Sequence, residues 1–90
     1  MSRAHLLISG RVQGVTFRAS TKSKAESFDL KGWVRNTEDG KVEAVIEGEK
    51  DKIKKLIDWA RQGPTLAKVE DIKIEWEERQ NDLEKFQIKR

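Results

Sequence analysis

The spacing of the apolar residues changes along the chain, and the order of these changes is the feature that most limits the possible folds. Apolar or small residues alternate with polar ones over residues 4–13, 32–37, 41–47 and 68–77. They recur every three or four residues over residues 17–28 and 49–62. A period of two indicates a half-buried strand, and a period near 3.6 indicates an amphipathic helix. The predicted order is therefore strand, helix, strand, strand, helix, strand, with a short fifth strand within residues 83–89.

Turn residues support these boundaries. Asp39-Gly40 separates the second and third strands, and both residue types tolerate the positive φ that a two-residue hairpin requires. Gly63-Pro64 follows the second helix, as expected where a helix ends. The first helix is polar and has a weaker apolar stripe, so we expect it to depend on the sheet for its stability.

This order of elements predicts an α+β fold of the ferredoxin-like type. In such a β-α-β-β-α-β sandwich, one antiparallel sheet carries both helices on one face. The 90 residues are enough for one domain, residues 1–90, with one core and one site. Because this fold supports many unrelated functions, the activity has to be argued from individual residues.

The composition excludes several kinds of site. The sequence has no cysteine and a single histidine, His5. Disulfides, thiol catalysis and thiolate metal sites are thereby excluded, and a histidine-based metal site or a Ser-His triad is not expected. The absence of cysteine points to a cytoplasmic protein. The longest apolar run, Leu6 to Ile8, is too short for a membrane span. Enrichment in Lys and Glu resembles the composition of thermophilic proteins.

Positive charge is concentrated in the first part of the chain. Residues 1–37 contain seven basic and two acidic residues, whereas residues 38–90 contain twelve basic and fourteen acidic residues. A positive field near the first turn suits a protein that binds an anion. From charge alone, a solvated basic surface is the simpler interpretation.

The first turn, Gly10 to Arg18, has the features of an anion site. The strand is predicted to end at Gln13, Gly14 permits a tight turn, and the helix begins by Phe17. Amide groups at the start of a helix lack intrahelical partners and attract anions. Arg18 adds a planar guanidinium that stays protonated and matches phosphate oxygens two at a time. Taken alone, however, an ordinary turn with a surface arginine is the simpler interpretation.

A second polar feature is Asn36, which lies in a β-rich segment where asparagine is disfavoured. Its amide could position a water molecule or a substrate. Without other information, a residue that begins the hairpin turn is the better interpretation.

These two segments, G-R-V-Q-G-V-T-F-R and G-W-V-R-N-T-E-D-G, resemble the two signature segments of the acylphosphatase family. The resemblance continues over nearly the whole chain, through Val42-Glu43, Glu47-Gly48, Gly63-Pro64, Ala67, Val69 and Phe86-Gln87-Ile88. It implies hydrolysis of a carboxyl-phosphate mixed anhydride to a carboxylate and phosphate, without a metal or cofactor. The substrate would be a small acyl phosphate, and inorganic phosphate or sulfate would bind as an anion.

The resemblance also assigns residues. The family's phosphate-binding arginine falls on Arg18, and its water-positioning asparagine falls on Asn36. Its phosphate-binding loop falls on Gln13, Gly14, Val15, Thr16, Phe17 and Arg18. In this interpretation the enzyme is a monomer that binds neither nucleic acid nor membrane. One departure from the family pattern is Asp29, which precedes Leu30 where glycine is usual, so a strained left-handed backbone is expected there.

Three other classes of protein share this order of elements. An RNA-recognition motif stacks bases on aromatic residues of its central strands, but the first strand here has none and the chain has only six aromatic residues. A metallochaperone of this fold would need paired cysteines. A domain that binds an acyl or carbamoyl phosphate within a larger enzyme is the third alternative, which the short length and the lack of a linker disfavour.

Overall fold

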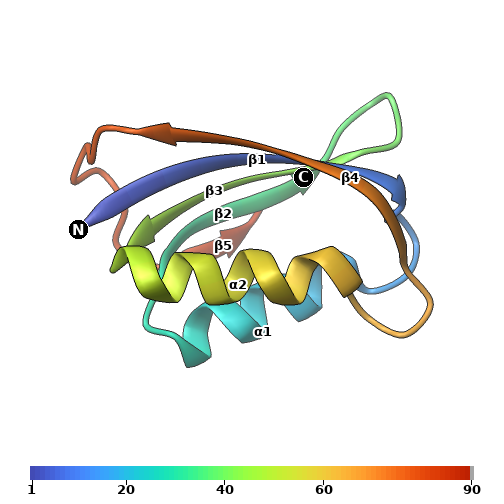
Figure 1. The fold of residues 1–90 in the computed structure, drawn as a ribbon, viewed down its shortest axis with the longest axis horizontal. Coiled ribbons are helices and arrows are strands. Elements are labelled where there is room, and N and C mark those ends of the chain that lie inside the picture. The colour runs from blue at the N-terminus through green and yellow to red at the C-terminus, as the bar shows by residue number, and fades with distance from the viewer. Residues whose placement is uncertain (90) are drawn as a thin grey trace.

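We describe the protein from a computed structural model, which describes residues 1–89. Along this part of the chain the elements are β1 (Ser2–Arg11), α1 (Phe17–Ser27), β2 (Lys31–Asn36), β3 (Val42–Gly48), α2 (Lys50–Gln62), β4 (Lys68–Glu77) and β5 (Phe86–Ile88). Figure 1 shows the strands as one curved sheet with both helices on the same face. The predicted order is confirmed. Most boundaries differ from the prediction by one or two residues, and the fifth strand is shorter than the segment predicted to contain it.

The strands lie across the sheet in the order β4-β1-β3-β2-β5. β1 is antiparallel to both β3 and β4, and β2 is antiparallel to β3, which confirms the ferredoxin-like arrangement. The four strands of the predicted sandwich are antiparallel as expected, and the additional β5 pairs with β2 in parallel, so the complete sheet is mixed. β4 and β2 run in opposite directions. The chain reverses direction in the connection after β4, so β5 runs opposite to β4 and parallel to β2.

The core lies between the helices and the sheet, and it contains the residues that the periodicity places there. On β1 the buried apolar side chains are those of alternate residues, Ala4, Leu6 and Ile8. On α2 they follow helical spacing, at Ile53, Leu56, Ile57 and Ala60. The stripe on α1 is narrower and buries only Phe17, Thr21 and Ala25. The ring of Phe17 lies 5.7 Å from that of Trp59, centroid to centroid, so the start of α1 is packed against the end of α2.

Charged side chains fix the connection between β4 and β5. The guanidinium of Arg3 donates to Glu47 and Asp82, each at 3.0 Å, and to Glu77 at 3.3 Å. Glu47 is on β3 and Asp82 lies in the connection, so this network holds the connection against two central strands. Asp29 has a φ of 56°, which confirms the left-handed backbone expected at that position.

The topology brings together three segments that are far apart in the sequence. β1, β2 and β5 all run in the same direction, so their carboxyl ends lie at one end of the sheet. The loop that follows β1 also begins α1 at this end (Figure 1). The fold therefore places the predicted loop beside the end of β2, where Asn36 is the last residue.

Candidate active site

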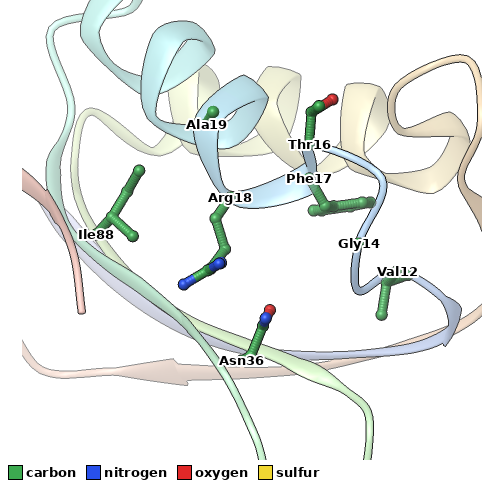
Figure 2. Close-up of a pocket in the computed structure, with 8 residues that line it drawn as sticks. All are labelled: Val12, Gly14, Thr16, Phe17, Arg18, Ala19, Asn36 and Ile88. Atoms are coloured by element: carbon green, nitrogen blue, oxygen red, sulfur yellow. The ribbon is translucent and has the colours of Figure 1, made fainter. Parts of the chain in front are cut away.

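A pocket of about 280 Å³ lies where these segments meet. It is lined by Val12, Gly14, Thr16, Phe17, Arg18, Ala19, Asn36 and Ile88. Figure 2 shows Arg18 reaching from the start of α1 toward Asn36, with Ile88 on one side of the pocket and Val12 on the other. The two residues predicted to be catalytic, Arg18 and Asn36, therefore share one pocket.

The loop before α1 has a backbone that presents amide groups. Gly14 has a φ of 73° and Thr16 a φ of 63°, so two of its residues are left-handed. Such a conformation is unusual for a β-branched residue such as threonine, and strained residues of this kind cluster at functional sites. The Thr16 side chain makes no capping hydrogen bond to the helix. In Figure 2 it points away from the space between Arg18 and Asn36, so Thr16 presents its backbone to the pocket.

Six consecutive amide groups, those of residues 14–19, have no hydrogen-bond acceptor within residues 1–89. The first backbone hydrogen bond of α1 is donated by Ser20 to the carbonyl of Thr16, at 2.9 Å. Free amide groups at a helix start carry partial positive charge, and a curved run of them forms an anion-binding concavity. The loop therefore has the properties of a phosphate site.

Arg18 is the second residue of α1 and is half-buried. Within residues 1–89 its guanidinium takes part in no ion pair and in no side-chain hydrogen bond. A guanidinium that faces a pocket and is not neutralised by a carboxylate is available to an anionic ligand.

Asn36 presents a buried acceptor without a partner. Its Oδ1 atom is buried and accepts no hydrogen bond from any group in the described part of the chain. A buried polar atom without a partner costs about 1–3 kcal/mol, and such atoms in native structures call for an explanation. A ligand or a water molecule held in the adjacent pocket would supply the missing donor.

The hairpin that follows Asn36 is held by its own polar contacts. The hydroxyl of Thr37 donates to the Asp39 carboxylate and accepts a hydrogen bond from the Lys41 amide at 3.0 Å. The hydrogen bond from Thr37 is the main cause that lowers the pKa of Asp39 below its ordinary value, and the charge of Lys41 adds to it. These contacts hold the hairpin segment that directly follows Asn36.

The structure separates the predicted loop residues into two groups. Gly14, Thr16, Phe17 and Arg18 line the pocket, whereas Gln13 and Val15 do not. Val15 is buried in the core, and Gln13 donates to backbone carbonyls of the hairpin. Three lining residues, Val12, Ala19 and Ile88, were not predicted. For Ile88, its place in the terminal Phe86-Gln87-Ile88 segment was the available signal.

Residues 1–89 show neither a metal-binding cluster nor a membrane-spanning helix. No group of three or more His, Asp or Glu side chains is arranged to hold a metal ion there. Neither helix has the length and apolar character needed to cross a membrane.

Comparison with known proteins identifies the family. A family model described as Acylphosphatase matches residues 4–88. The chain belongs to the acylphosphatase family. An acylphosphatase of Pyrobaculum aerophilum is 53% identical over 89 residues, which cover 98% of this chain and 94% of that protein. The crystal structure of an acylphosphatase from Bacillus subtilis superposes with a TM-score of 0.96 at 31% identity, and all of each chain is covered.

Membership in the acylphosphatase family confirms the predicted fold and the predicted class of enzyme, a hydrolase that cleaves acyl phosphates.

The same fold also occurs within a larger protein. Full-length HypF, in a phosphate- and nucleotide-bound form, matches 97% of this chain with a TM-score of 0.85 and 27% identity, but the match covers only 11% of HypF.

Proposed function

We propose that the pocket binds the phosphoryl group of an acyl phosphate between the loop amides and Arg18, while Asn36 holds the attacking water molecule. The observation that supports this proposal is the buried Oδ1 atom of Asn36, which has no hydrogen-bond partner within residues 1–89 and belongs to the same pocket as Arg18 and the loop amides. An amide oxygen accepts a hydrogen bond from water and leaves a lone pair of the water oxygen free to attack phosphorus.

Such a small set of groups is sufficient for this reaction. The leaving carboxylate has a conjugate acid with a pKa of about 4, so it departs as an anion without a general acid. The transition state of phosphoryl transfer is loose, with negative charge on three equatorial oxygens. Positioning and positive charge therefore matter more than a strong base. Arg18 and the loop amides supply the charge, and neither a metal nor a cofactor takes part in the proposed reaction.

The water oxygen forms a bond to phosphorus as the bond between phosphorus and the carboxyl oxygen breaks. One proton of the water passes to an oxygen of the substrate's own phosphoryl group, because none of the pocket-lining residues that the structure describes is a general base at neutral pH. The products are a carboxylate and inorganic phosphate.

Two further properties follow from this proposal. Inorganic phosphate, as a product with the same three oxygens, competes with the substrate for the loop and Arg18, and sulfate binds there in the same way. Arg18, Asn36 and the loop all belong to one copy of the chain, so the proposed reaction requires no second subunit, and we propose a monomeric enzyme. The cysteine-free composition supports a cytoplasmic location.

The proposal is tested with Arg18→Gln, because removal of one preorganised charged donor typically lowers kcat by about 10²-fold or more. We expect that loss together with weaker inhibition by phosphate, since the guanidinium contacts the phosphoryl group before and during the reaction. Lys24→Gln is the matched control, because Lys24 is an exposed cation of the same helix. Activity of the unmodified enzyme should persist in EDTA. A folded Arg18→Gln enzyme with the turnover of Lys24→Gln would refute the assignment, and activity lost in EDTA and restored by a divalent ion would refute the metal-free reaction.

A further inference from the structure

Gln13 makes a contact that its expected place in the phosphate-binding loop does not explain. Its side-chain Nε2 donates to the carbonyl oxygen of Thr37 at 2.8 Å and to that of Lys41 at 2.9 Å. Both hydrogens of the amide group are thereby used. The side chain does not line the pocket. Gln13 is therefore turned away from the phosphate site and toward the hairpin.

The two carbonyls belong to the base of the hairpin that follows Asn36. Thr37 is the next residue after Asn36, and its own amide donates to the carbonyl of Lys41 at 2.9 Å. The carbonyl oxygen of Lys41 therefore accepts two hydrogen bonds, one from the Thr37 amide and one from the Gln13 side chain. Any movement of this hairpin base relative to Gln13 would also move Asn36, since only one peptide bond separates Asn36 from Thr37.

The contact joins two parts of the site that are not connected by direct strand pairing. β1 and β2 are not neighbours in the sheet, because β3 lies between them. Within residues 1–89, the two bonds from Gln13 are the sole hydrogen bonds between residues 12–19 and the hairpin, residues 36–41. The loop itself contains left-handed residues and free amides, so regular secondary structure does not fix its distance from Asn36.

We propose that Gln13 is a positioning residue that sets the distance between the phosphate loop and Asn36. This inference depends on the proposed function, in which the loop and Arg18 hold the phosphoryl group and Asn36 holds the water molecule. A displacement of about 1 Å between reacting groups can lower a rate by about 10²-fold. Without the Gln13 bridge, the distance between the water molecule and phosphorus would no longer be fixed. The loop amides and Arg18 would still bind phosphate.

The test uses Gln13→Met, which keeps the length of the side chain and removes both donors. We expect kcat to fall by about 10-fold or more, and the inhibition constant of inorganic phosphate to change by less than about threefold. Gln13→Asn is the second variant, since it remains polar but is one methylene too short to reach both carbonyls. Glu38→Gln is the matched control, because Glu38 is an exposed residue of the same hairpin and neither of its backbone groups belongs to the Gln13 bridge. The control should retain kcat within about twofold.

Combination with Asn36→Ala separates positioning from a structural role. If Gln13 acts through the water that Asn36 holds, Gln13→Met should lower the residual rate of Asn36→Ala by less than about twofold, whereas independent effects would multiply. The inference is overturned if folded Gln13→Met and Gln13→Asn keep wild-type kcat, if phosphate affinity falls as much as kcat, or if the two effects multiply. If Asn36→Ala itself retains the wild-type rate, the proposed function fails instead, and the two failures are distinguishable.

Discussion

Substitution of Gly63 by alanine tests how the end of α2 supports the active site. Gly63 caps α2 with a φ of 68° and a ψ of −170°, a conformation that is almost restricted to glycine. A Cβ atom at this position would lie 2.7 Å from Cε2 of Phe17 and 3.2 Å from Cβ of Ala67. Phe17 begins α1 and lines the pocket next to Arg18, so the clash would be transmitted to the site.

The magnitude follows from three contributions. The backbone strain costs about 2 kcal/mol, and the contact with Phe17 adds about 2 kcal/mol as overpacking. Alanine also reduces the entropy of the unfolded chain, which offsets about 0.7 kcal/mol. Gly63→Ala should therefore lower the free energy of unfolding by about 3 kcal/mol. For a domain of this size the corresponding decrease in Tm is about 12–24 °C.

Gly40→Ala is the control for the strain alone. Gly40 has a φ of 90° at the hairpin tip, but nothing lies within 4 Å of the position its Cβ would take. We expect a loss of about 1 kcal/mol for this variant. Thermal melts of both variants, followed by circular dichroism, provide the comparison. Equal decreases in Tm would refute the argument, because they would leave no effect of the contact with Phe17.

Two further predictions concern charged groups of the sheet. Arg3→Ala leaves the carboxylate of Glu47, which is only 5% exposed, without its main partner, and should lower the free energy of unfolding in denaturant by about 3 kcal/mol; a loss under about 1 kcal/mol would contradict this. Burial alone would raise the pKa of Glu43, but the contacts with His5 and Arg35 outweigh burial and hold that pKa below its ordinary value of 4.5. Because the pKa is depressed on folding, Glu43 stabilises the protein above pH 4.5, and this contribution is lost as the pH falls further. The difference in the free energy of unfolding between wild type and Glu43→Gln should therefore decrease on acidification. A difference that stays constant with pH would contradict the assignment.

The order of elements could be predicted because its signals are local, whereas Arg18 and Asn36 were singled out by the resemblance of two short segments to those of a family. Alternation and helical spacing are properties of short windows, and they identified both helices and the four long strands. Each of the two segments, one around Arg18 and one around Asn36, is an unbroken stretch of the sequence. The topology then brings them together without further information, since β1 and β2 end at the same end of the sheet.

The features that could not be predicted depend on contacts between distant residues. Gln13 bonds to residues 24 and 28 positions later, and no periodic pattern marks such a pair. The parallel pairing of β5 depends on where the connection after β4 crosses, which Arg3 and Asp82 help to fix. The first strand also ends two residues before Gln13, because Val12 is buried without being part of the hydrogen-bonded ladder.

The proposed reaction requires that one part of the pocket binds phosphate while another part, Asn36, holds the water molecule. It is tested most directly by measuring both turnover of an acyl phosphate and the affinity for inorganic phosphate in purified Asn36→Ala. An interaction made only in the transition state lowers kcat and kcat/KM together and leaves ground-state binding unchanged. We therefore predict a folded protein that is almost inactive but binds phosphate with an affinity within about threefold of wild type. A folded Asn36→Ala enzyme that cleaves acyl phosphate at the wild-type rate, or one that loses phosphate binding together with activity, would contradict the account.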